Sequence, residues 1–153
     1  MNSKYKKILS DSPQYNFENS LYHWITQVHN VYEHRIEFSL KNHGLDHSRI
    51  RVLSALKVKP EVSISSLSEM LVIPLSSTTK IVYRLKKEGL VSVYDCPLDT
   101  RVTRSELTEL GSVMIQKIKE TTQIVSERSY NGIAPVQLEK MLQNLKHIFY
   151  KMK

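Results

Sequence analysis

The chain has 153 residues, which is about one domain and is long enough to bury a hydrophobic core. Its formal net charge of +7 and its pI near 9.5 favour a polyanionic partner. A single cysteine excludes an internal disulfide and is typical of a reducing cytoplasm, and four glycines are too few for a glycine-rich phosphate loop. The N-terminus shows no signal peptide or membrane span. We therefore expect a cytoplasmic protein that is neither membrane-bound nor nucleotide-dependent.

The first predicted elements are an arm and a long amphipathic helix. Residues 1–18 show no periodicity and are expected to form a loose N-terminal arm. Apolar side chains then recur at three- and four-residue spacing, which predicts a helix of about 20 residues ending near Gly44. These side chains are Leu21, Trp24, Ile25, Val28, Val31, Tyr32 and Ile36.

Three shorter helices are predicted in the middle third, where most of the positive charge is concentrated. The first spans about 47–57, and the second spans 66–71 with a serine at 65 or 66 as its cap. The third lies within PLSSTTKIVYRLKKEGLV, residues 74–91. A short helix, a turn with Pro74 and a longer helix have the layout of a helix-turn-helix.

The two faces of this third helix differ in chemistry. One face is expected to pack inward and holds Thr78, Ile81, Val82 and Leu85. Hydroxyl groups at a helix start, beside free N–H groups and the positive end of the dipole, suit phosphate oxygens and base acceptors. We therefore predict DNA contacts from Ser76, Ser77, Thr79, Lys80, Tyr83, Arg84 and Lys87. The alternative is a helix cap followed by a solvated basic face.

A β-hairpin is predicted next, because VSVY (91–94) and RVTRSEL (101–107) alternate around the turn CPLD. A basic hairpin beside a recognition helix is a wing. We expect Arg101 and Arg104 to contact DNA, with Arg101 in a minor groove, and Asp99 to pair with an arginine and fix the turn. The alternative is an ordinary polar hairpin with a surface salt bridge, which contributes little to stability.

Two long helices are predicted to close the chain, at about 108–129 and 135–152, and Pro135 suits the first turn of the second. The last helix carries an apolar stripe that is too long for a small core to cover: Leu138, Met141, Leu142, Leu145, Ile148, Phe149 and Met152. With the first helix it predicts a homodimer, unless these helices cover one another within one chain. The predicted fold is mostly α (α+β), with a helical dimerisation region at 19–44 and 108–153 and a winged helix-turn-helix at 45–107.

The pattern D-x-R-x5-L-T-x-x-G at Asp99, Arg101, Leu107, Thr108 and Gly111, together with SSTTKIVYRLKKEGLV, resembles the winged helix-turn-helix of MarR-family bacterial transcription regulators. The resemblance covers residues 45–112. It implies a homodimer that binds a pseudo-palindromic operator and that a small-molecule effector releases, with small aromatic compounds as the candidates. It also implies a ligand pocket between the dimerising helices and the winged domain, for which the candidate residues are His23, Trp24, Tyr32 and Met114.

The remaining chemistry-bearing residues give no further site. The pair His43 and His47 has four-residue spacing, but Gly44 between them indicates a helix end, so we expect no metal site. Cys96 could act as a redox sensor if Arg101 or Arg104 lowered its pKa, although a lone thiol without a resolving partner is usually inert. No catalytic motif ties the serine, histidine and aspartate residues together, so we expect neither an enzyme nor a cofactor.

Two functions remain from the sequence. The first is a dimeric, sequence-specific regulator of transcription that binds double-stranded DNA, with repression as its expected mode. The second is a winged-helix module whose basic face, including Tyr83, binds an acidic protein instead of DNA.

Overall fold

The computed structural model describes residues 16–153 and contains six α-helices and a small sheet within that range. The arm predicted at 1–18 lies outside the described residues apart from its end. There, Phe17–Asn19 forms the 3₁₀ helix η2, and the Asn16 side chain caps it by accepting from the Glu18 N–H at 3.1 Å. The predicted arm is therefore ordered at least from residue 17.

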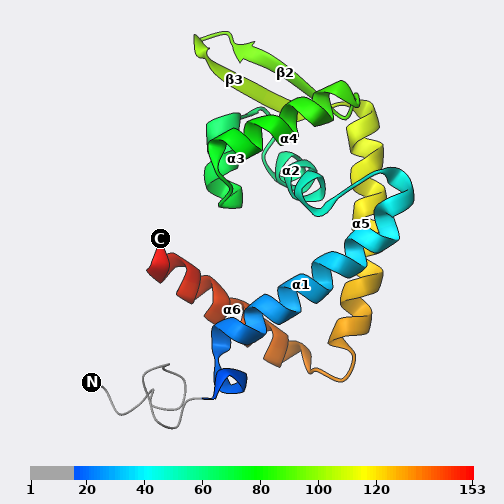
Figure 1. Ribbon diagram of the computed structural model, residues 1–153, viewed down its shortest axis with the longest axis vertical. Coiled ribbons are helices and arrows are strands. Elements are labelled where there is room, and N and C mark those ends of the chain that lie inside the picture. The colour runs from blue at the N-terminus through cyan, green and yellow to red at the C-terminus, as the bar shows by residue number, and fades with distance from the viewer. Residues whose placement is uncertain (1–15) are drawn as a thin grey trace.

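The helices follow the sequence periodicity closely (Figure 1). Their bounds are α1 Leu21–Leu40, α2 His47–Val58, α3 Ile64–Leu71, α4 Leu75–Lys87, α5 Glu109–Tyr130 and α6 Pro135–Met152. A 3₁₀ turn, η3 (Lys41–His43), joins α1 to α2 and ends at Gly44, which adopts the left-handed conformation with φ of 67°. Glycine favours this conformation because it has no Cβ.

The winged helix-turn-helix is built on α2, whose side chains Val52, Leu53 and Leu56 are almost fully buried. The inner face of α3 contributes Leu67, and that of α4 contributes Val82 and Leu85. The fold class predicted from the sequence is confirmed. One correction concerns α3, which begins two residues early because Ser63, rather than Ser65 or Ser66, caps it by accepting from the Ser66 N–H at 3.1 Å.

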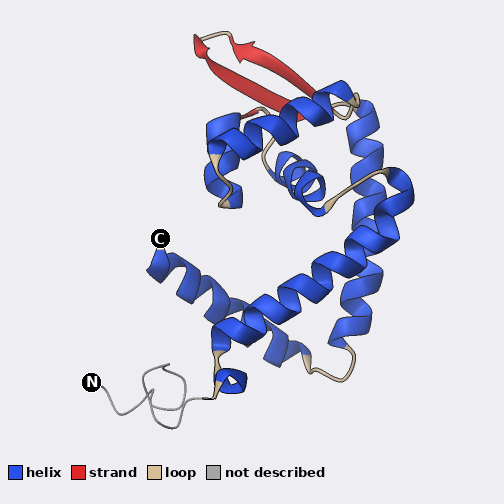
Figure 2. Ribbon diagram, viewed as in Figure 1, coloured by secondary structure: helices blue, strands red, loops and turns tan. Residues whose placement is uncertain are grey.

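A three-stranded antiparallel sheet in the order β1-β3-β2 completes this part of the chain (Figure 2). The strands are β1 Val62–Ser63, β2 Val91–Cys96 and β3 Asp99–Leu107. The predicted hairpin is β2–β3, with Val91 opposite Leu107 and an irregularity between Asp95 and Cys96. The sequence reading missed β1, which pairs Val62 with Ser105.

The other helices extend from one side of the winged part, and both α1 and α5 contact α2 (Figure 1). α1 packs beside α5, and α6 turns back from the end of α5, so that the Tyr22 hydroxyl on α1 donates to the Met152 Sδ at 3.5 Å. No residue of α6 is buried. Within residues 16–153, no helix has the length and apolar character needed to cross a membrane.

Candidate nucleic-acid interface

The start of α4 lacks a side-chain cap. Its N-cap is Pro74, whose carbonyl accepts from the N–H groups of Ser77 at 3.0 Å and Thr78 at 2.9 Å. The cap function that the sequence offered as an alternative for the Ser/Thr run is therefore wrong. An uncapped helix start leaves backbone N–H groups for water or an anion, and the helix dipole favours negative charge at that point.

The four hydroxyl residues divide into two pairs. Thr78 is buried and its hydroxyl donates to the Pro74 carbonyl at 3.2 Å, whereas the Thr79 hydroxyl donates to the Leu75 carbonyl at 2.8 Å. Ser76 and Ser77 are exposed, and the structure shows no hydrogen bond from either hydroxyl to another described residue. Ser76 and Ser77 therefore present free hydroxyls, whereas Thr79 presents chiefly its methyl group.

The outer face of α4 continues as a basic and aromatic row. Lys80, Tyr83 and Lys87 are exposed, opposite the buried Val82 and Leu85, so the predicted orientation of the helix is confirmed. Lys86, on the same helix, was not among the predicted DNA-contacting residues. Its Nζ lies 5.8 Å from the centre of the Tyr83 ring and 3.5 Å from the Val93 carbonyl on β2.

Arg84 lies at the edge of this row and contacts acidic side chains. Its Nη1 lies 3.5 Å from Asp46 Oδ2, and its Nε lies 3.4 Å from Glu88 Oε1. The nearly buried Arg49 bonds the same two carboxylates, with its Nη1 donating to Glu88 at 2.7 Å. These ion pairs tie the start of α2 to the end of α4, so part of the Arg84 charge is already compensated within the fold.

The wing has a defined turn. Asp99 accepts from the backbone N–H of Arg101 at 3.1 Å and from its Nε at 3.0 Å, which confirms the predicted pairing. The Arg101 guanidinium, together with that N–H, holds the pKa of Asp99 below its usual value. The Arg101 side chain is nevertheless 89% exposed. It is oriented by Asp99 but remains accessible to a ligand.

Cys96 ends β2 at the turn of the wing, opposite Asp99, whereas Arg104 lies further along β3. Arg104 Nη1 donates to the Glu61 carbonyl at 2.7 Å, which ties β3 to the turn before β1. A hydrogen bond from Arg104 lowers the pKa of the Cys96 thiol, as the sequence reading anticipated for a nearby arginine. Cys96 is buried, however, so this thiol is shielded from bulky oxidants.

The joint between the wing and α5 explains the T-x-x-G part of the motif. Thr108 caps α5 by accepting from the Gly111 N–H at 3.0 Å, and its hydroxyl donates to the Gly89 carbonyl at 2.7 Å. A Cβ on Gly111 would lie 2.0 Å from the Leu90 carbonyl oxygen. Only glycine therefore fits where α5 crosses the end of α4.

Two of the four residues predicted to line a ligand pocket lie on one cleft. Trp24 and Tyr32 line an apolar cleft of about 650 Å³ between α1, α5 and α6, but neither His23 nor Met114 lines it. Met114 packs against the core, and the His23 ring contacts the rings of Phe17 and Trp24.

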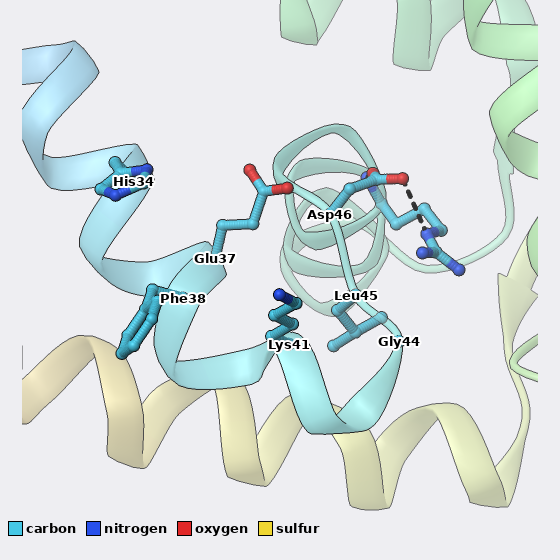
Figure 3. Close-up of a pocket in the computed structure, with 8 residues that line it drawn as sticks. His34, Glu37, Phe38, Lys41, Gly44, Leu45 and Asp46 are labelled. Carbon is cyan, nitrogen blue, oxygen red and sulfur yellow. Dashed lines mark hydrogen bonds and ion pairs between the residues drawn. The ribbon is translucent and has the colours of Figure 1, made fainter.

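A second cleft, of about 430 Å³, lies where the resemblance placed the pocket, between α1 and the start of α2. Glu37 reaches into it from α1 and Lys41 from η3, and Asp46 borders it as the N-cap of α2 (Figure 3). None of the four predicted pocket residues lines this cleft, whose lining from α1 and η3 is mostly polar.

Comparisons with known proteins identify the family. The sequence model of the MarR family matches residues 45–103. The transcriptional repressor IacR of Pseudomonas putida is 36% identical over 141 residues, which cover 92% of this chain and 84% of the relative. The chain belongs to the MarR family.

Solved structures agree with the fold of this MarR-family regulator. A MarR-family regulator from Silicibacter pomeroyi matches with a TM-score of 0.81 and 20% identity, covering 90% of this chain and 93% of the other. A variant of MarR from E. coli, solved in complex with operator DNA, matches with a TM-score of 0.76 and 18% identity over 84% of this chain and 92% of the other. The family and these relatives are transcriptional regulators, so the predicted class of protein is confirmed.

One cluster in this MarR-family regulator was missed by the sequence reading. His29 and Glu33 on α1 meet His47 at the start of α2. The four-residue spacing of His29 and Glu33 on a predicted helix could have indicated that these two side chains lie close together. His47 joins them only in the folded chain.

Proposed function

We propose that this regulator binds pseudo-palindromic duplex DNA as a homodimer and represses transcription, with α4 in the major groove and the wing in an adjacent minor groove. The observation that carries the proposal is the outer face of α4, which has an uncapped start, two free hydroxyls and a row of exposed basic side chains beside a wing with an exposed arginine. This combination suits base edges and phosphates.

The site residues contribute in different ways. Ser76, Ser77 and Lys80 reach base edges, because the first turns of a recognition helix enter the groove. Tyr83 and Lys87 contact the backbone, and Arg101 enters the minor groove. Arg84 and Arg104 direct donors to carboxylates and to the Glu61 carbonyl, so they add positive charge near the DNA. Thr79 offers its methyl group to a thymine methyl.

The homodimer is supported by exposed apolar side chains on two helices. Leu21, Trp24, Val28 and Val31 on α1 and Val136, Met141, Leu142, Leu145 and Phe149 on α6 remain exposed in the single chain. A second copy would cover them. We therefore assign residues 19–44 and 108–153 to dimerisation and 45–107 to DNA binding. Twofold symmetry then requires two half-sites about one helical turn apart.

The comparisons support DNA over an acidic protein as the partner. IacR of Pseudomonas putida is a repressor, and the E. coli MarR variant was solved with operator DNA. A regulator that binds chromosomal DNA acts in the bacterial cytoplasm, at the nucleoid.

Selection from a random duplex pool tests this function. We expect recovered sites to contain inverted repeats, and the affinity for random duplexes to fall steeply with salt. Arg101→Ala should weaken binding to all duplexes by similar factors and reduce the slope of log K against log salt by about one unit for each phosphate that is no longer neutralised. Recovery of no common sequence, with a flat salt response, would favour the acidic-protein alternative.

A small aromatic acid is the effector class that we propose for the cleft of Figure 3. Regulation of DNA binding by 6-hydroxynicotinic acid is described for Bordetella bronchiseptica BpsR, and Rhodococcus jostii CouR was solved with p-coumaroyl-CoA; the identities are 18% and 20%, and the TM-scores 0.78 and 0.79. In this chain Lys41 offers a cation to a carboxylate, and the cleft contacts both α1 and α2. An occupant there would alter the angle between the two helices.

The effector proposal is tested by releasing the selected operator with a panel of aromatic acids and their amides. The acids should release DNA from the wild type but only weakly from Lys41→Gln. Lys117→Gln on α5 removes the same charge outside the cleft and should respond as the wild type does. Equal release from all three proteins would place the effector elsewhere.

A further inference from the structure

Three side chains of metal-ligand type converge where α1 meets α2. His29 and Glu33 lie one turn apart on α1, and His47 is the first residue of α2. The Nε2 atoms of both imidazoles contact the same carboxylate oxygen, Glu33 Oε1, with a distance of 2.5 Å from His47. One ligand atom from each residue lies within 4.8 Å of the others.

Local structure holds these three side chains together. The left-handed Gly44 reverses the chain after η3, and Asp46 caps α2 by accepting from the Arg49 N–H at 3.0 Å. The first turn of α2 is thereby held against α1. The rings of His29 and His47 pack edge to face with centroids 5.7 Å apart. The site is thus built from two anchored helices rather than from a loop.

Two atoms of the cluster are buried without hydrogen-bond partners. Glu33 Oε1 and His47 Nε2 are sealed from solvent, and their close contact lacks hydrogen-bond geometry. No other buried side-chain nitrogen or oxygen in residues 16–153 is left unsatisfied. Buried polar atoms nearly always have a partner, because leaving one unsatisfied costs about 1–3 kcal/mol. Among the buried side-chain nitrogens and oxygens of the described residues, only these two therefore lack a partner.

We propose that His29, Glu33 and His47 form a binding site for a divalent transition-metal ion such as Zn²⁺. Two histidines and one glutamate are the protein ligands of open zinc sites, in which water takes the fourth position. The His29 side chain is 55% exposed, whereas those of His47 and Glu33 are 26% and 19% exposed, so water can reach the ion from one side.

The electrostatic surroundings are compatible with an ion. Glu33 supplies a negative charge and Glu37 lies close enough to act on His47, whereas Arg51 opposes a cation there. Zn–N and Zn–O distances of about 2.0–2.2 Å require ligand atoms to stand roughly 3.3 Å apart. Each imidazole nitrogen must therefore move away from Glu33 Oε1 by about 1 Å, which the exposed His29 permits.

The competing explanation is a metal-free triad in which both imidazoles donate Nε2–H to Glu33. Only metal binding distinguishes the two. An ion at this position would also tie the proposed dimerisation helix α1 to the winged helix-turn-helix, and could thereby couple metal binding to DNA binding. This coupling rests on the proposed function, whereas binding of the ion does not.

The test uses the full chain without an affinity tag, freed of metal by a chelator. Titration with Co²⁺ should give visible absorption bands that saturate at one ion per chain, and Zn²⁺ should abolish them. Zn²⁺ should also raise the thermal midpoint, because a ligand that binds only the folded state stabilises it. Glu33→Gln and His47→Gln, on different helices, should each weaken binding by more than about tenfold. His43→Ala removes an exposed imidazole outside the cluster and should bind as the wild type does.

Two results would overturn the proposal. One is a wild type that shows no saturable Co²⁺ spectrum. The other is unchanged affinity in Glu33→Gln or His47→Gln with a native circular dichroism spectrum, because the ion would then occupy surface histidines. No DNA is present in these measurements. Failure here therefore leaves the proposed function intact, and failure to select an operator leaves the metal site intact.

Discussion

Ser76 and Leu85 lie on opposite faces of α4, so substituting each by alanine should affect different properties. Ser76 is exposed and caps nothing, and alanine is the best helix former, so Ser76→Ala and Lys80→Ala should change the free energy of unfolding by no more than about ±0.5 kcal/mol. Each should instead cost about 1–3 kcal/mol of discrimination at one position of each half-site. Leu85 is fully buried, and Leu85→Ala should destabilise the fold by about 2–5 kcal/mol.

Thermal melts and competition binding to the selected operator measure the two effects. Lys117→Ala on α5 is the control for removal of one positive charge and should leave sequence discrimination unchanged. If Lys80→Ala melted early yet bound the operator normally, α4 would not present this face to DNA.

Cys96 should show a pH dependence to which Arg104 contributes most. Arg104 lowers the thiol pKa by hydrogen bonding to the thiolate, so the reactive form persists to lower pH than in a free cysteine. In Arg104→Gln the thiol pKa rises, and the midpoint of a pH profile of alkylation by iodoacetamide should move upward. Lys86→Gln is the control, and its midpoint should match that of the wild type. Burial of Cys96 slows its alkylation in both proteins, so the comparison uses the midpoint of the pH profile and not the absolute rate. An unchanged midpoint in Arg104→Gln would mean that Arg104 interacts with Glu61 alone.

At the scale of elements, the junction between the wing and α5 should tolerate no side chain at Gly111. A methyl group there would meet the Leu90 carbonyl oxygen, which belongs to the backbone and cannot rotate away. Gly111→Ala should therefore destabilise the fold by about 1–3 kcal/mol through overpacking, even though alanine favours a helix. Denaturant unfolding measures this, with Ser112→Ala at the exposed neighbour as the control. A stabilised Gly111→Ala variant would show that α5 can shift away from Leu90.

The elements were predictable from the sequence where a period or a stop signal defines them. The seven apolar positions of the last helix and Pro135 gave α6 its observed bounds, and the row through Lys80 and Tyr83 gave α4 its orientation. The two-residue β1 could not be found, because it has no period and exists only through pairing with β3. The cap of α3 was misplaced because Ser63, Ser65 and Ser66 offer the same hydroxyl.

The candidate site was predictable only as far as one element reaches. The face of α4 follows from helical geometry, and the Asp99–Arg101 pair lies within one turn. Partners from distant segments were not foreseeable: Asp46 for Arg84, Glu61 for Arg104, and His47 for the α1 pair. The residues that line the cleft between α1 and α2 were not foreseeable for the same reason, because the side of α1 that faces α2 depends on the turn at Gly44.

At the scale of the whole molecule, α6 should gain its stability from a partner. None of its residues is buried, yet Leu142 and Leu145 lie on an apolar stripe. We expect a sedimentation mass of about twice the 17.8 kDa chain at micromolar concentration, and a thermal midpoint that rises with concentration. Leu142→Asp combined with Leu145→Asp should give monomers that lose operator affinity. Gln143→Asp adds a charge on the opposite side of α6 and should remain dimeric. A wild-type monomer would remove the basis for a palindromic operator.

The separation of the DNA-contacting face on α4 from the apolar stripe on α6 has a genetic consequence. A chain that carries Lys80→Ala keeps its α6 stripe and can still pair with wild-type chains. If both chains are expressed equally and pair at random, only about one quarter of the dimers contain two intact DNA-contacting faces. The altered allele should therefore be dominant over the wild type in a reporter strain. Adding the two α6 aspartates to the same allele should make it recessive, because its product can no longer enter a mixed dimer.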